Sequence, residues 1–138
     1  MSKTVKVANA PTPEQAAAFD EYVAFWQSVL NLNDWRIERS AKPAKNAMAD
    51  VEFDPVARLA IYRLGDFGST AITNLSLSQT ALHEVLHVFL HDLVVIAQDR
   101  DATFEQLEAA EHRVINVLEK ILVGDEDAKS ESDRSTVH

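Results

Sequence analysis

The sequence predicts an α+β domain built around one histidine-bearing helix. Three capping patterns each precede an apolar repeat with helical spacing, and three short strand-like segments lie between the first and second of these patterns. The third observation is the motif HEVLH at residues 83–87. We therefore expect the order helix, three strands, helix, helix.

Each helix is expected to begin at a motif in which a hydroxyl side chain precedes glutamine by three residues. These motifs are TPEQ at residues 12–15, SLSQ at 76–79 and TFEQ at 103–106. Such a pair can satisfy the free backbone N–H groups of the first helical turn. The middle helix is apolar on most sides, which predicts a central and buried position. The last helix is expected to end near Gly124.

The strands are expected in WRIERS (35–40), AMADVEF (47–53) and LAIYRL (59–64). These segments are short, rich in β-branched or aromatic residues, or alternate between apolar and polar residues. Asp54 and Pro55 supply a turn, so the second and third strands are expected to form a hairpin.

The length of 138 residues and the hydrophobic share of 46% suit one small domain, which we place at residues 12–123. Residues 1–11 are expected to form a flexible lead-in, and the small, polar stretch 124–138 a disordered tail. The start of the chain has no apolar signal segment, and histidines and acids interrupt its longest apolar stretch. We therefore expect a cytoplasmic protein without a membrane span.

Charge and composition exclude several classes of site. The formal net charge of −9 argues against binding to a phosphate backbone, so no nucleic-acid partner is expected. The absence of cysteine excludes disulfide bonds, thiolate nucleophiles and cysteine-based zinc sites. The metal ligands that remain are histidines and carboxylates.

The histidine helix carries the pattern of a zinc site. His83 and His87 are four residues apart, which places them on one face of a helix where both imidazoles can reach one ion. Glu84 is close enough to touch a water on that ion and to act as its general base. The alternatives are histidines satisfied within the core and histidines that lie on the surface by coincidence.

A third ligand is expected from the last helix. His91 lies about 12 Å along the helix from His83, so we expect it to line the cleft, to support a ligand, or to be an ordinary histidine at the rim. Glu111 shares a face with apolar residues and is our predicted third ligand, because a buried carboxylate needs a cation. Glu108 is the alternative, and the acid that does not bind would hydrogen-bond a ligand histidine. Either acid could instead be an ordinary exposed residue of the helix. The neighbouring His112 is expected to face solvent or to stabilise a developing oxyanion.

On these residues the chain resembles the small phage and prophage metallopeptidases, which are related to the SprT-like and ImmA/IrrE-type minimal zincins. The segment TALHEVLHVFL (80–90) carries most of the likeness. LNLNDWRIERS (30–40), AIYRL (60–64) and AEHRVINVL (110–118) add weaker support, and the likeness covers roughly residues 13–122.

The resemblance implies a minimal zincin fold with a small antiparallel three-stranded sheet. It implies His83 and His87 as Zn²⁺ ligands and Glu84 as the catalytic base. It also implies the host cytoplasm as the location, if the chain is phage-encoded. SprT-type proteins usually carry a further downstream histidine and often a zinc ribbon. This chain has no cysteine and no basic tail, so proteolysis linked to DNA is not expected.

The leading interpretation is therefore a zinc-dependent peptidase that hydrolyses peptide bonds in a protein or peptide substrate inside the cell. The substrate is expected to pair with the strand at residues 59–64 as an added strand. One alternative is a zinc-stabilised protein-binding module without turnover. Another is an acidic, metal-free interaction protein with a basic partner.

Overall fold

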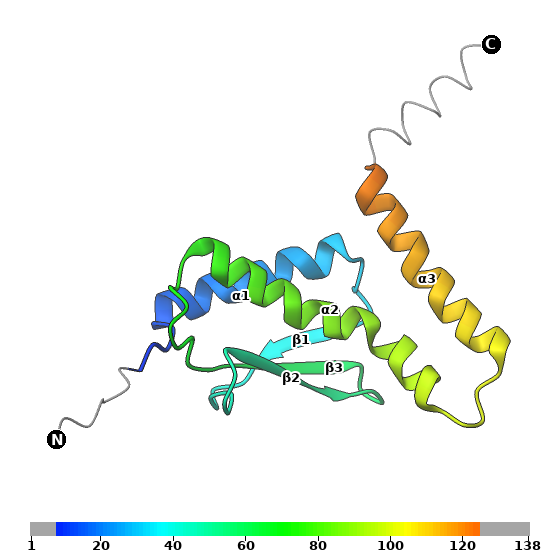
Figure 1. Ribbon diagram of the computed structural model, residues 1–138, viewed down its shortest axis with the longest axis horizontal. Coiled ribbons are helices and arrows are strands. Elements are labelled where there is room, and N and C mark those ends of the chain that lie inside the picture. The colour runs from blue at the N-terminus through cyan, green and yellow to red at the C-terminus, as the bar shows by residue number, and fades with distance from the viewer. Residues whose placement is uncertain (1–7, 125–138) are drawn as a thin grey trace, which may run out of the picture. The chain divides into compact units, whose positions relative to one another are not determined.

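The fold is a computed structural model that describes residues 8–124 (Figure 1). The predicted α+β class and the order of elements are confirmed. The predicted lead-in and tail lie outside the described residues except for residues 8–11 and Gly124. The elements are α1 (Pro13–Val29), β1 (Arg36–Arg39), β2 (Ala49–Asp54), β3 (Leu59–Leu64), α2 (Asn74–Gln98) and α3 (Phe104–Val123).

The sheet is mixed, with the strand order β1-β3-β2. β2 and β3 form the predicted antiparallel hairpin, in which Val51 lies opposite Tyr62. β1 runs parallel to β3, with Ile37 opposite Ala60. The prediction of a wholly antiparallel sheet is therefore wrong for β1. Alternation along a strand indicates which side chains share a face, but it does not indicate which strands are neighbours.

β3 is the central strand, so it has no free edge for a substrate. The prediction that a peptide pairs with residues 59–64 is therefore wrong, because β3 is already paired on both sides. The edges of the sheet are β1 and β2. The central position agrees with the burial of Ala60 and Tyr62, which are 0% and 3% exposed.

The predicted caps of α1 and α3 are confirmed. The N–H of Gln15 donates to Thr12 Oγ1 at 3.2 Å, and the N–H of Thr12 donates to Gln15 Oε1 at 2.9 Å. Thr103 and Gln106 make the same reciprocal pair at 3.1 and 2.9 Å. As predicted, α3 ends at Gly124, whose φ of +86° favours glycine.

α2 begins earlier than predicted. Its cap is Thr73, whose Oγ1 accepts from the N–H of Ser76 at 3.1 Å, while the N–H of Thr73 donates to Ser76 Oγ at 2.9 Å. The SLSQ motif therefore lies inside the first turns, and the prediction that it opens the helix is wrong. A serine hydroxyl performs here the role that glutamine performs in the other two helices.

The chain divides into two compact units. Among the described residues, the first comprises 8–28 and 32–88, and therefore holds α1 up to Ser28, the sheet and α2 up to Val88. The second comprises 29–31 and 89–124, and holds the end of α2 and α3. The prediction of one domain over residues 12–123 stays a prediction.

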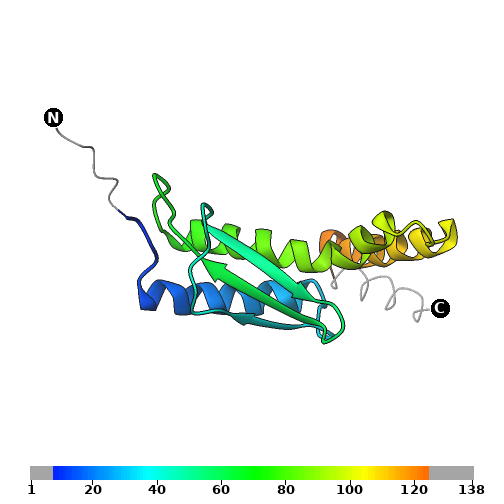
Figure 2. The same ribbon diagram turned by 90° about the horizontal axis from the view of Figure 1, so that it is seen from below.

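In the first unit, α1 and the first part of α2 lie side by side on one face of the sheet (Figures 1 and 2). Phe19 of α1 contacts Tyr62 of β3 with ring centroids 5.5 Å apart. Trp26 of α1 donates from Nε1 to the carbonyl oxygen of Ser78 at 3.2 Å. These contacts place the core between the two helices and the sheet.

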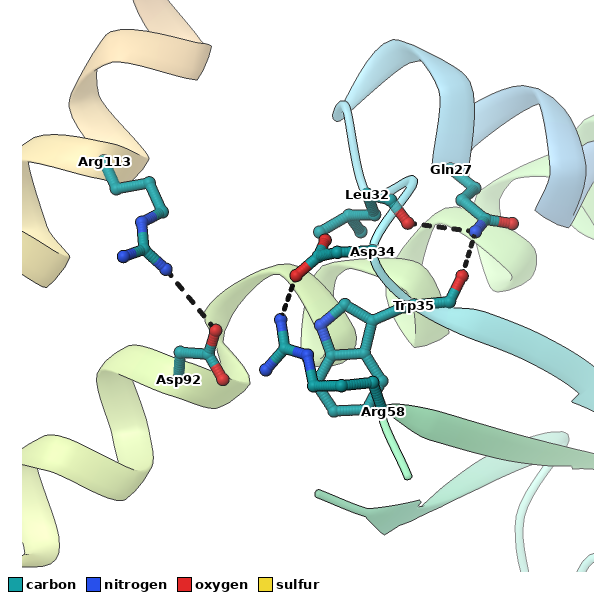
Figure 3. A network of polar contacts seen from close by, with 7 residues as sticks. All are labelled: Gln27, Leu32, Asp34, Trp35, Arg58, Asp92 and Arg113. Atoms are coloured by element: carbon teal, nitrogen blue, oxygen red, sulfur yellow. Dashed lines mark hydrogen bonds and ion pairs between the residues drawn. The ribbon is translucent and has the colours of Figure 1, made fainter. Parts of the chain in front are cut away.

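The turn between α1 and β1 is held by polar contacts (Figure 3). Gln27 Nε2 donates to the carbonyl oxygens of Leu32 and Trp35 at 3.0 and 2.8 Å. Arg58 stacks over the ring of Trp35 at 4.2 Å and forms an ion pair with Asp34. The contacts join the end of α1 and the start of β1 to the β2–β3 turn.

The predicted burial of α2 is confirmed only for its first part. Its buried residues all precede Phe89, and Val94 and Val95 are almost half exposed. By length and composition alone α2 could cross a membrane, with a mean hydropathy of 1.4 in its most apolar window. Core helices of soluble proteins share this property, so the expected absence of a membrane span stays a prediction.

Candidate metal centre

His83 and His87 lie on one exposed face of α2, one turn apart. Their ring centroids are 4.9 Å apart and the ring planes meet at 83°. Two imidazoles bound to one zinc ion at about 2.0–2.1 Å with tetrahedral angles have centroids about 5 Å apart. The observed separation therefore fits two ligands of a single ion. Neither ring is buried, so the alternative of satisfied core histidines is not supported.

Glu84 lies in a different environment from the two histidines. It is 5% exposed, and no other Asp, Glu, Lys, Arg or His among residues 8–124 is buried. Burial raises the pKa of the Glu84 carboxyl above its ordinary 4.5, His83 opposes this rise, and the charge of Asp50 adds to it. A carboxylate with a raised pKa is a stronger proton acceptor than an ordinary glutamate.

A cavity of about 420 Å³ adjoins Glu84. One wall is α2, including His83 and Glu84, and another is the chain entering β2, including Met48. The remaining lining residues are small or polar and come from both walls and from the loop before α2: Ala47, Ala49, Thr70, Ser76, Gln79 and Thr80. The buried carboxylate is therefore next to a space that a substrate can enter.

The position of the wall that precedes β2 depends on Gly65. A Cβ at this position would lie 2.1 Å from the carbonyl oxygen of Ala47, closer than real Cβ contacts come. The N–H of Gly65 donates to the carbonyl oxygen of Met48 at 2.8 Å. Only glycine lets the segment before β2 pass this close to the end of β3, and that segment forms a wall of the cavity.

Sequence reasoning did not identify Asp50 as a neighbour of Glu84. Asp50 accepts two hydrogen bonds from Arg63, at 2.7 Å from Nε and 3.0 Å from Nη2. Arg63 Nη2 is also 3.0 Å from Glu52 Oε1. Alternation in AMADVEF could have assigned Asp50 to the face of the strand that lies opposite the apolar face. The effect of Asp50 on the pKa of Glu84, however, depends on how close the tertiary structure brings β2 to α2.

The acids predicted as third ligands lie in the second unit. Glu111 is exposed, so the expectation of a buried acid is wrong. Leu118, on the same stripe of α3, is itself 37% exposed. Glu108 Oε1 is 3.7 Å from His112 Nε2, and both side chains are more than half exposed. The solvent-facing option for His112 agrees with this, and the ligand roles of Glu111 and Glu108 stay predictions.

The remaining histidine of α2 has no demonstrated role. His91 is half-buried and does not line the cavity beside Glu84. In the second unit, Arg113 Nη1 of α3 is 3.6 Å from Asp92 Oδ2 of α2 (Figure 3). This ion pair joins the two helices of that unit.

Over residues 8–124, no three side chains of His, Asp or Glu form a group that could hold a metal ion. The donor pair that fits zinc is therefore His83 with His87, from the first unit alone. The chain matches no protein-family model, no curated protein and no solved structure.

Proposed function

We propose that the chain is a zinc-dependent metallopeptidase that hydrolyses peptide bonds in a protein substrate. The observation that carries the proposal is Glu84, a buried carboxylate that lines a cavity and directly follows His83. Burying a charged group without a partner is costly. Such a cost is typical of sites where a shifted pKa serves the chemistry.

His83 and His87 would hold the zinc ion through their imidazoles. Their ring separation of 4.9 Å supports this assignment. For the third ligand we propose Glu111, with Glu108 as the alternative. Bound zinc supplies a polarising charge for the scissile carbonyl and lowers the pKa of a bound water towards about 7.

Glu84 would transfer the proton. Its carboxylate accepts a proton from the attacking water and then delivers it to the nitrogen of the departing amine, so the residue ends as it began. The raised pKa favours the first step, because a stronger base accepts the proton more readily. The second step remains favourable because the departing amine nitrogen is more basic than a carboxylate. Burial in the cavity wall also limits competition from bulk water.

The test is Glu84→Gln in zinc-loaded protein, with a quenched fluorescent casein as the probe. We expect the cleavage rate to fall by at least about a hundredfold, with zinc content unchanged, because glutamine has similar size but cannot accept the proton. Glu119→Gln, an exposed change on α3, is the matched control and should retain the wild-type rate.

Two results would contradict the peptidase proposal. Cleavage by E84Q at the wild-type rate would show that the carboxylate is not the base. Wild-type protein that binds one equivalent of zinc and cleaves neither casein nor a mixture of unstructured peptides would favour the binding module instead.

A further inference from the structure

We infer that Asn9 is a positioning residue for the substrate cleft, through a brace that ties the start of the described chain to the loop 66–70. The inference rests on the proposed peptidase function. Asn9 itself does not line the cavity beside Glu84. Its effect would be exerted through the loop, and the loop contributes to the cleft at two places.

The loop 66–70 borders two adjoining hollows. Thr70 lines the cavity of about 420 Å³ that contains Glu84. The residues before it line a second, larger hollow of about 860 Å³. Ala47 and Met48 line both. An extended peptide that reaches Glu84 past Met48 would therefore also lie against this loop.

Asn9 contacts the loop with its backbone and its side chain together. Its N–H donates to Asp66 Oδ1 at 3.0 Å, and its carbonyl oxygen accepts from the N–H of Phe67 at 2.9 Å. Its side-chain Nδ2 donates to the carbonyl oxygens of Gly68 and Thr70, at 3.0 and 2.8 Å. Four hydrogen bonds thus join residues 57–61 positions apart in the chain.

The chemistry of the brace requires an asparagine. A side-chain amide carries two N–H donors on one nitrogen and can serve two carbonyl oxygens at once. Aspartate has the same shape but no N–H, and it would place negative charge against the oxygens of Gly68 and Thr70. Alanine removes the side-chain contacts without adding repulsion.

The loop 66–70 is also held by contacts of its own. Loss of the hydrogen bonds from Asn9 should therefore increase the motion of the loop rather than unfold the protein. Phe67 is 2% exposed and packs into the core. Asp66 Oδ1 also accepts from the N–H of Gly68 at 2.7 Å. The carbonyl oxygens of Gly68 and Thr70 accept hydrogen bonds from the Asn9 side-chain amide. The segment 68–70 is therefore the part of the loop that depends most on Asn9.

The test compares Asn9→Ala and Asn9→Asp in the full chain, with Asn116→Ala and Asn116→Asp on the exposed face of α3 as matched controls. Hydrogen–deuterium exchange is measured over residues 64–73 in the metal-free and zinc-loaded protein. We expect at least about fivefold faster exchange in both Asn9 variants, with N9D the faster. The Asn116 variants should match the wild type.

Cleavage kinetics on quenched fluorescent casein give the second readout. If the brace positions the cleft, N9A should raise KM by about three- to tenfold and leave kcat within about twofold, because the base at Glu84 is untouched. A purely structural role predicts faster exchange with both constants unchanged, and that result would overturn the inference.

Failure of the brace and failure of the proposed function are distinguishable. If N9A shows the wild-type rate of hydrogen–deuterium exchange over residues 64–73, the brace is refuted, whatever the cleavage kinetics show. Faster exchange in N9A, combined with wild-type protein that cleaves no casein, leaves the brace in place and counts against the peptidase, and with it the positioning role.

Discussion

Tyr62 illustrates how a buried polar group is accommodated in this core. Its phenol is 3% exposed, and the hydroxyl donates to Asp20 Oδ1 at 2.5 Å. Asp20 also accepts from Arg39 Nε at 2.9 and 3.2 Å. A buried hydroxyl without a partner would be costly, so the carboxylate makes the burial tolerable. Burial raises the pKa of the phenol above its ordinary 10.0, and the hydrogen bond to Asp20 raises it further.

Tyr62→Phe should lower the free energy of unfolding by about 1.5–3 kcal/mol, the usual contribution of a hydrogen bond to a charged group. Because the folded pKa lies above the unfolded one, this contribution is complete below pH 10 and is lost as the pH rises further. Urea unfolding of wild type and Y62F, at neutral pH and above pH 10, measures it. Tyr22→Phe is the control, and a wild-type advantage that grows with pH would contradict the assignment.

For single residues, roles that depend on neighbouring sequence positions could be predicted. Contacts with residues far along the chain could not. His83, Glu84 and His87 are recognisable because their spacing along one helix determines their geometry. Asn9 and Gly65 are not, because the brace spans 57–61 positions and Gly65 meets a segment that precedes it by a whole hairpin. Glu111 was expected to be buried from its apolar neighbours, yet those neighbours are themselves partly exposed.

The helices show why capping is readable from sequence. A capping box involves residues three apart, so TPEQ and TFEQ identify the first turns of α1 and α3 without knowledge of the rest of the fold. The start of α2 was missed because Thr73 is paired with serine rather than glutamine. Ser76 Oγ also contacts the carbonyl oxygen of Ala71 at 2.8 Å, which joins the cap to the loop before it.

Thr73→Ala should therefore destabilise the protein more than Gln79→Ala, although sequence alone predicted that the helix begins at Ser76 with Gln79 as its capping partner. Loss of an N-cap costs about 1 kcal/mol, which corresponds to a melting temperature lower by about 3 °C. Thr103→Ala, at the confirmed cap of α3, provides the reference for an intact capping box. Thermal melts followed by circular dichroism give the melting temperatures of the three variants. If T73A melts at the same temperature as the wild type, Thr73 is not the cap of α2.

In the sheet, the positions of the strands could be predicted from the sequence but their pairing could not. All three strands were found where the residue pattern predicts them, within one or two residues at each end. Their order was not found, because β3 inserts between β1 and β2 and so makes the β1 pairing parallel. This order determines that β2, and not β3, is the edge strand beside the cavity wall.

For the molecule as a whole, the proposed zinc site should couple metal binding to stability. An ion that binds only the folded state stabilises it by about 2.7 kcal/mol at a hundred times its dissociation constant. Adding zinc should raise the melting temperature of the wild type, and a chelator should reverse the change. His83→Ala and His87→Ala should abolish this response while His112→Ala retains it. A zinc response that survives both H83A and H87A would exclude this pair as ligands.

Zinc affinity, measured by calorimetric titration, distinguishes the two candidate acids. If Glu111 completes the site, Glu111→Gln should weaken zinc binding by at least about tenfold in a calorimetric titration, and Glu108→Gln should change it little. The reverse order would assign Glu108. Equal affinity in both variants and the wild type would show that neither acid is a ligand.

The sequence by itself determined the α+β class, the positions of all six elements, two of the three helix caps, and the histidine–glutamate constellation on α2. Each of these depends on residues within a few positions of one another, where helix and strand periods dictate geometry. Only the tertiary structure decided the parallel pairing of β1, the cavity against which Glu84 is buried, and the brace from Asn9. These depend on packing between distant segments, and no local period encodes that packing.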